Sequence, residues 1–258
     1  MTEKTSVKEQ FPAEACDFVV FMDLTYNGQE DKLVPKANVA NDRFPTLHKM
    51  LQKFHESFKE NRPRSLLLMF GIQVQNYRAS PVELLQNLQK IVKVVDYTIL
   101  ETHHSRSSTT CNALLPTSFR EYSDLSDNLP VVTALDWTIQ LQKGVEPTPN
   151  LCFSLNLASL HYTLKTTTTH TCTRSDWVGP IQDERAIAVY HYRNNEWQSF
   201  LTPDSITKMM RLALKVNPSV CVAAYYVDYE DYQGMCKLNQ TFPRLTAVRH
   251  VLDQVRTR

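Results

Sequence analysis

Short runs of apolar residues alternate with amphipathic segments along most of this 258-residue chain. The apolar runs favour strands buried on both faces, which are typical of a parallel sheet covered by helices. The segments between them carry apolar residues three or four apart, which favours helices. The alternation predicts an α/β fold, and both a barrel and a doubly wound sheet fit it. The expected strands are 19–22, 65–70, 94–100, 151–157, 186–192 (a short strand or hairpin arm) and 220–227, and the expected helices are 44–58, 81–92, 131–142 and 205–215.

Charge and motifs exclude several classes of function. The formal net charge of +1 gives no electrostatic reason to expect nucleic acid or an anionic membrane as a partner. No run approaches the roughly 18 apolar residues that a membrane-spanning helix needs. The six cysteines form no CxxC pair, which argues against a zinc site. No glycine-rich loop follows an expected strand, so nucleotide binding has no support. We expect no cofactor and no metal.

Several motifs follow one another in a fixed order over most of residues 16 to 240. They are CDFVVFMDLTY at 16–26, NDRFPTL at 41–47, the apolar run at 65–70, VDYTILETHH at 95–104, LQKGV at 141–145, the strand and its exit at 151–164, NEWQSF at 195–200 and VAAYYVDYEDYQGMC at 222–236. In order and spacing they resemble the fourth to eighth strands of family 18 glycoside hydrolases, the chitinases and chitinase-like proteins.

The resemblance implies a (β/α)8 barrel with its site at the carboxyl ends of the strands. Because only 15 residues precede Cys16, we expect a partial barrel of strands four to eight, with a polar segment at 1–15 and a single domain at 16–258. The α+β insertion after the seventh strand is expected as a shortened remnant at 165–200. A partial barrel exposes sheet edges, so either the chain is a fragment of a longer product or the edges are covered by other means.

The first motif carries the catalytic positions of the family. Family 18 enzymes use substrate-assisted hydrolysis, in which a glutamic acid after the fourth strand protonates the leaving oxygen. In this resemblance Thr25 stands at the acid position, and a threonine hydroxyl does not ionise near neutral pH. Phe18 and Phe21 replace the two outer aspartates, so only Asp23 remains, followed by Tyr26. The resemblance therefore implies a chain without the catalytic acid.

Later motifs also differ from the family pattern. His103 and His104 stand at the positions of a sixth-strand tyrosine and aspartate. Tyr225 replaces the eighth-strand tryptophan that forms the floor of the sugar pocket, and Glu101 replaces a methionine of the sixth strand. Ala158 and Leu160 replace a tyrosine and an arginine of the seventh strand. The catalytic groups are lost as a set, which indicates a catalytically inactive protein.

Four polar residues form a hypothetical new cluster at the barrel mouth. Residues two apart on a strand face the same way, so Asp23, Glu101 and His103 are expected to point toward the mouth together with Tyr225. Such a cluster fits a relocated acid/base pair or a weak metal site of two carboxylates and an imidazole. The simpler interpretation is a set of polar residues tolerated at a wet pocket mouth.

Cysteines and a sequon bear on the compartment. Cys172 and Cys236 resemble a pair that is disulfide-bonded in many family members; two buried thiols are the alternative. Asn239 begins a glycosylation sequon. Both features, with the family, favour an extracellular protein. The polar start Met1-Thr2-Glu3-Lys4 predicts no signal peptide, and we expect the signal to be lost together with the first three strands.

Three hypotheses of function follow. The first is a chitinase-like protein without catalysis that binds N-acetylglucosamine-type glycans or a protein ligand, with Tyr26, Trp197 and Tyr225 as stacking residues. The second is a residual glycoside hydrolase of chitinase type that uses Glu101 or Asp23 as its acid. The third is a truncated product without an independent function.

Overall fold

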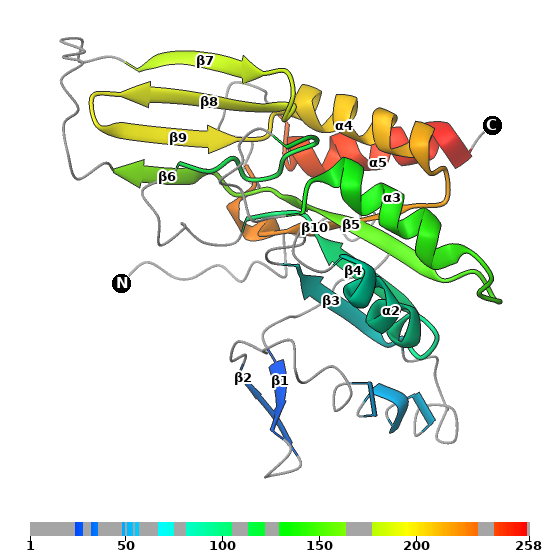
Figure 1. The fold of residues 1–258 in the computed structure, drawn as a ribbon. Coiled ribbons are helices and arrows are strands. Elements are labelled where there is room, and N and C mark those ends of the chain that lie inside the picture. The colour runs from blue at the N-terminus through cyan, green and yellow to red at the C-terminus, as the bar shows by residue number, and fades with distance from the viewer. Residues whose placement is uncertain are drawn as a thin grey trace.

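The computed structural model describes eleven segments of the chain: residues 24–27, 32–35, 48–49, 51–53, 55–56, 67–74, 81–104, 113–121, 129–163, 177–231 and 240–256. Three sheets lie within them, one of four parallel strands, one of four antiparallel strands and one of two strands (Figure 1). The fold is therefore α/β, as predicted, and the described strands leave the parallel sheet open. No helix in these segments is long and apolar enough to cross a membrane.

The parallel sheet carries the candidate site. Its strand order is β10-β5-β4-β3, with every neighbouring pair parallel. The strands are β3 (Met69–Gln73), β4 (Tyr97–Glu101), β5 (Asn150–Asn156) and β10 (Cys221–Tyr225). Because the strands run in one direction, their carboxyl ends meet at one edge, where loops can bring functional side chains together.

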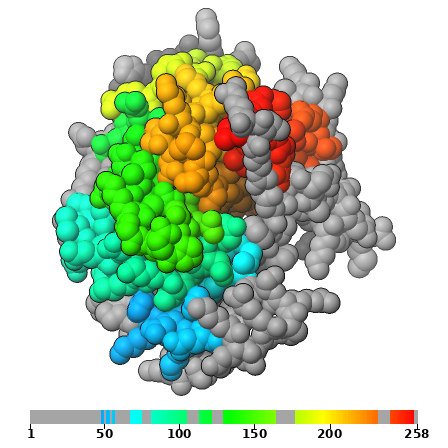
Figure 2. Space-filling view, turned by 90° about the vertical axis from the view of Figure 1, so that its right-hand side faces the viewer, coloured from blue at the N-terminus to red at the C-terminus, as the bar shows by residue number. Residues whose placement is uncertain are grey.

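One face of this sheet is covered by helices. They are α2 (Pro81–Ile91), α3 (Val131–Gln142), α4 (Pro203–Val216) and α5 (Pro243–Arg256). Leu151, Phe153 and Leu155 of β5 are fully buried in one apolar cluster with Leu135 of α3 and Met209 of α4. The helices contact one another in chain order, and α3, α4 and α5 form a continuous surface in Figure 2. This apolar layer is the core of the described structure.

Local sequence explains why α4 begins where it does. Thr202 lies before the helix in an extended conformation, and its hydroxyl accepts a hydrogen bond from the backbone N–H of Ser205 at 3.0 Å. This side chain satisfies one of the N–H groups that a helix start leaves unpaired. Pro203 occupies the first turn, where its missing N–H costs nothing. The same segment buries Ile206 and Met210 against the sheet.

The antiparallel sheet has the strand order β6-β9-β8-β7. Its strands are β6 (Leu160–Thr163), β7 (Val178–Asp183), β8 (Ala188–Arg193) and β9 (Glu196–Phe200). A two-residue turn joins β8 to β9, and Asn194 there adopts a positive φ of 51°, as tight hairpins require. The Ser199 hydroxyl donates to the carbonyl of Leu114 at 2.7 Å and fastens the sheet to segment 113–121. The sheet covers most of the segment expected as an insertion remnant.

Most of the predicted elements are found in the described segments. The helix predicted at 131–142 and the strand predicted at 151–157 match α3 and β5 within one residue at each end. The strand predicted at 65–70 begins later, as β3 at Met69, and the strand predicted at 19–22 lies outside the described residues. The sequence analysis did not predict β6, β7, β9 or α5.

The segment that contains Thr25 differs from its expected place at the end of a barrel strand. Backbone pairing places it in β1 (Leu24–Asn27), which runs antiparallel to β2 (Lys32–Pro35), with Thr25 opposite Val34. This hairpin forms a two-stranded sheet of its own (Figure 1). In the described structure Thr25 is thus not on a strand of the parallel sheet.

A disulfide joins Cys152 of β5 to Cys221 of β10. The two residues are direct partners in the register of the parallel strands, so their side chains meet on the face opposite the helix core. The sequence analysis instead expected a bridge between Cys172 and Cys236, which both lie outside the described residues. It missed the Cys152–Cys221 bridge because pairing of strands 69 residues apart in sequence follows from topology, not from spacing.

We predict that the Cys152–Cys221 bridge is a major source of stability. Because it closes a loop of 69 residues, the double variant Cys152→Ala/Cys221→Ala should lose about 4 kcal/mol of unfolding free energy. Urea unfolding followed by circular dichroism measures this loss. Reductant should shift the wild-type midpoint in the same direction and shift that of the double variant less, because the double variant lacks this bridge. A wild-type midpoint that does not respond to reduction would contradict the prediction.

Candidate functional site

Two strand ends are joined by a hydrogen bond across the strand between them. The hydroxyl of Tyr225, the last residue of β10, donates to Oε1 of Glu101, the last residue of β4, at 3.0 Å. Because β5 lies between these strands, the Tyr225 side chain must pass over it. Ser154 of β5 is small and fully buried, which leaves the space for this crossing. Glu101 is only 4% exposed, so its carboxyl group lies below the surface.

His103 completes the cluster. Its ring lies 4.0 Å from that of Tyr225, centroid to centroid, and its Nδ1 forms a 2.7 Å hydrogen bond with Oγ of Ser154. Ser154 Oγ also accepts the backbone N–H of Thr102 at 2.8 Å. These bonds fix the position of the imidazole relative to the sheet. We call Glu101, His103, Ser154 and Tyr225 the strand-end cluster.

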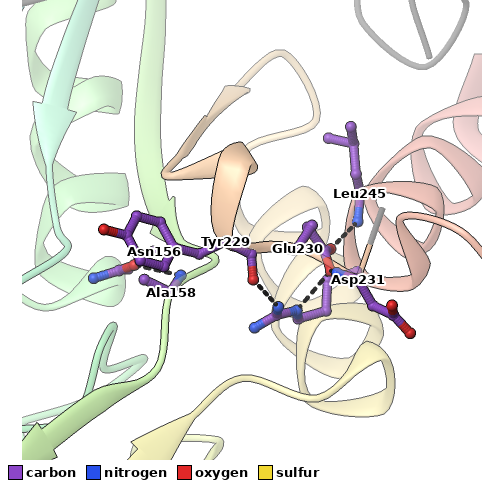
Figure 3. A network of polar contacts seen from close by, with 7 residues as sticks. Asn156, Ala158, Tyr229, Glu230, Asp231 and Leu245 are labelled. Atoms are coloured by element: carbon purple, nitrogen blue, oxygen red, sulfur yellow. Dashed lines mark hydrogen bonds and ion pairs between the residues drawn. The ribbon is translucent and has the colours of Figure 1, made fainter. Parts of the chain in front are cut away.

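Asn156 ties the exit of β4 to the exit of β5. Its side-chain amide donates to the carbonyl of His104 at 2.6 Å. Its Oδ1 accepts the N–H of Ala158 at 2.7 Å (Figure 3). Its backbone N–H donates to Oγ1 of Thr117 at 3.0 Å. Asn156 is fully buried, so these bonds satisfy polar groups that would be costly to leave unpaired. The edge of the sheet is thereby held in one arrangement.

Burial sets the protonation of two side chains at this edge. Desolvation lowers the pKa of His104 from its ordinary 6.5 to about 4, so the imidazole is neutral at physiological pH. Desolvation raises the pKa of Tyr225, and the charge and hydrogen bond of Glu101 raise it further. Tyr225 therefore stays a neutral phenol and remains a hydrogen-bond donor to Glu101 across the physiological range.

The acidic-aromatic run after β10 has a structural role. Glu230 is fully buried at its side chain, and its carboxylate accepts Nε of Arg244 at 3.0 Å and the N–H of Leu245 at 3.0 Å. It thus caps the first turn of α5. Nη2 of Arg244 also donates to the carbonyl of Tyr229 at 3.2 Å (Figure 3). The turn that follows the strand-end cluster is therefore held firmly to α5.

The structure brings together three of the four residues of the hypothetical cluster, Glu101, His103 and Tyr225. The fourth, Asp23, lies outside the described residues, as does Phe21. Thr25 and Tyr26 lie in β1, of which only the backbone is described. His104 is buried at the same edge. Trp197 lies on β9 and stacks on Tyr190 at 4.2 Å, within the antiparallel sheet. Asn239, the sequon residue, is outside the described segments.

Sequence reasoning missed two members of this edge, Ser154 and Asn156. A signal was present, because both are polar residues two apart in an otherwise apolar strand, and that spacing puts them on one face. In the described part of the chain, no group of three His, Cys, Asp or Glu side chains could hold a metal ion. The chemistry available here is hydrogen bonding and aromatic stacking around one buried carboxyl group.

Comparison with known proteins identifies the fold. No protein-family model matches the chain, and no curated protein matches it in sequence. Its fold, however, is that of the family 18 glycoside hydrolases, chitinases and chitinase-like proteins, which confirms the resemblance at the level of the fold.

Three solved structures illustrate the likeness. A group IV chitinase from Ostrinia furnacalis in complex with allosamidin superposes with a TM-score of 0.66 at 16% identity, over 85% of this chain and 66% of that one. A family 18 N-acetylglucosaminidase from Paenibacillus barengoltzii gives 0.60 at 14% identity, over 83% and 66%. YKL-39, crystallised in the presence of chitooligosaccharides, gives 0.59 at 14% identity, over 81% and 64%. The chain thus spans slightly under two thirds of each neighbour's length.

We predict that His104 makes folding stability depend on pH. Its pKa is lower in the folded state, so the folded chain binds fewer protons than the unfolded chain between pH 6.5 and about 4. The stability that depends on a neutral His104 is fully present above pH 6.5. It is lost as the pH falls toward 4, and the loss in unfolding free energy reaches about 3 kcal/mol. Urea unfolding of wild type and His104→Gln at pH 8 and pH 4.5 measures it. At pH 8 the difference in unfolding free energy between the wild type and His104→Gln measures the cost of changed packing. An equal difference at pH 4.5 would contradict the prediction.

Proposed function

We propose that this protein is a chitinase-like protein that binds N-acetylglucosamine-type oligosaccharides without hydrolysing them. The observation that carries the proposal lies at the carboxyl ends of parallel strands in a chitinase fold: Tyr225 donates a hydrogen bond to Glu101, and its ring packs on that of His103. Sugar sites combine aromatic surface with a small number of fixed polar groups, and this cluster offers both.

The fold correspondence is part of the proposal. We assign β3, β4, β5 and β10 to strands five to eight of a partial (β/α)8 barrel, within a single domain at 16–258. Their chain order equals their order in the sheet, as in a barrel. The antiparallel sheet, which lies between β5 and β10 in the chain, then corresponds to the insertion after the seventh strand.

The residues at the catalytic positions favour binding over hydrolysis. By the order of the sequence motifs Thr25 aligns with the position of the acid, although in the described structure it lies on the β1–β2 hairpin; its hydroxyl cannot supply a proton near neutral pH. Glu101 is a carboxylic acid, but it is buried and its Oε1 accepts the Tyr225 hydroxyl. A general acid must come within hydrogen-bond distance of the leaving oxygen, and this geometry holds Glu101 away from an incoming sugar.

Tyr225 is the residue best suited to meet a sugar. Its ring is half-buried and packs on His103. A sugar ring can therefore stack on Tyr225 with little loss of side-chain entropy, because the tyrosine is already held in place. The bond to Glu101 fixes the phenol in one orientation. Allosamidin and chitooligosaccharides accompany two of the neighbouring structures, which supports this ligand class.

An extracellular location is part of the proposal. A bridge such as Cys152–Cys221 persists in oxidising compartments, which supports an extracellular location. The expected pair of Cys172 with Cys236 and the sequon at Asn239 point the same way.

We predict that the purified protein binds tetra-N-acetylchitotetraose, with Tyr225→Ala weakening the affinity about tenfold because the stacking ring is removed. Isothermal titration calorimetry at pH 7 measures the dissociation constants. Cellotetraose, which lacks the acetamido groups, is the ligand control and should bind more weakly. Absence of binding by the wild type would overturn the proposal.

A residual glycosidase is the second candidate, because Glu101 places a carboxyl group at the strand ends, where it accepts the Tyr225 hydroxyl. We predict no turnover of a fluorogenic chito-oligosaccharide by the wild type between pH 4 and pH 8. Turnover that Glu101→Gln abolishes would replace the binding proposal with this one. A Thr25→Glu variant tests the acid position, because gained turnover would mean that the remaining site still supports catalysis.

A further inference from the structure

Aromatic rings continue from the strand-end cluster to the surface. His103 lies 6.1 Å from Tyr226, and Tyr226 lies 6.2 Å from Tyr229, between ring centroids. Both contacts are edge-to-face, which is a favoured geometry for aromatic pairs. Exposure rises along this path, from 1% for His103 to 66% for Tyr229. We call His103, Tyr225, Tyr226 and Tyr229 the aromatic ladder.

The outer end of the ladder is built on a constrained turn. Tyr226 has a left-handed backbone conformation, with φ 59° and ψ 45°, which costs a non-glycine residue about 1 kcal/mol. Such strain persists where the surrounding structure imposes it, and it is frequent at binding sites. Here the conformation turns the chain at the end of β10 and starts the short 3-10 helix η4 (Val227–Tyr229) that carries Tyr229.

The support beneath Tyr229 is rigid. Its carbonyl accepts Nη2 of Arg244, and the neighbouring Glu230 is buried in an ion pair with the same guanidinium. Glu230 also receives the N–H of Leu245, so the turn is attached to α5 by three contacts (Figure 3). A large aromatic side chain is thus displayed to solvent from a fixed backbone. Display on a fixed backbone lowers the entropy cost of binding, while burial of the ring in the core would serve stability only.

We infer that Tyr229, supported by Tyr226, is a second sugar-stacking position, and that the site takes an oligosaccharide of N-acetylhexosamines with successive rings at Tyr225 and Tyr229. The inference rests on the proposed function and extends it from a single sugar position to a chain. The apolar C–H face of a pyranose packs on an aromatic ring, and its edge hydroxyls remain in water. A position at the surface therefore adds affinity without needing buried polar partners.

The test is the dependence of affinity on ligand length. Calorimetry with N-acetylglucosamine, its dimer and its tetramer should show affinity rising with length in the wild type. Tyr229→Leu keeps apolar bulk but loses the ring, so it should bind the tetramer about fivefold more weakly and leave the monosaccharide unchanged. Tyr229→Phe keeps the ring and should bind like the wild type. Val82→Ala, at a residue of α2 that is also 66% exposed, is the control for a surface change elsewhere.

The outcomes separate the two proposals. If the wild type binds no chito-oligosaccharide, the proposed function fails and this inference fails with it. If Tyr225→Ala weakens binding but Tyr229→Leu matches the wild type for every ligand, only the second position is overturned. Equal weakening for monosaccharide and tetramer in Tyr229→Leu would also overturn it, because the residue would then not act on a separate ring. Circular dichroism melting of each variant confirms that the chain is folded.

Discussion

The alternation of side chains along β5 determines the rest of this structure. Leu151, Phe153 and Leu155 point into the apolar layer beneath α3 and α4, and all three are fully buried. Cys152, Ser154 and Asn156, between and beyond them, point to the opposite face. A shift of one residue would exchange the two sets and place polar groups in the core. The register of β5 is therefore fixed by burial, and the site inherits its geometry from that register.

Three residues on the face of β5 opposite the helices form three different interactions, one after another along the strand. Cys152 bonds covalently to β10, Ser154 forms hydrogen bonds with the segment after β4, and Asn156 fastens the exits of both strands. The neighbouring strands are thus attached to β5 both near its start, by the disulfide, and at its carboxyl end, by hydrogen bonds. Tyr225 reaches Glu101 across β5 at the level of Ser154, whose side chain is small and fully buried. The small size of Ser154 favours this crossing, and its hydroxyl also forms hydrogen bonds. The site is a consequence of strand pairing more than of loop conformation.

The sequence was sufficient to predict elements whose signal lies within a few neighbouring residues. α3 and β5 follow from apolar periodicity and from an apolar run, and both were predicted to within a residue. The convergence of Glu101, His103 and Tyr225 followed from the family resemblance, because the order of motifs supplied the topology. Elements with mixed polar and apolar surfaces, such as β7 and β9, gave no clear period and were missed. The Cys152–Cys221 bridge was missed because it requires knowledge of which strands are neighbours.

The pairing of Glu101 with Tyr225 also bears on why the site differs from the family 18 pattern that the sequence resembles. In the proposed correspondence these positions are a methionine and a tryptophan, both weakly polar, whereas here they are a carboxyl group and a phenol. Each change alone would bury a polar group without this partner, at a cost of about 1–3 kcal/mol. Together they form a 3.0 Å hydrogen bond in a site where Glu101 is 4% exposed. If these polar residues were only tolerated at a solvent-filled pocket mouth, they would be hydrated by water. Instead Glu101 is buried and forms a hydrogen bond with Tyr225. The match therefore favours a rebuilt site over one that has only lost its catalytic groups.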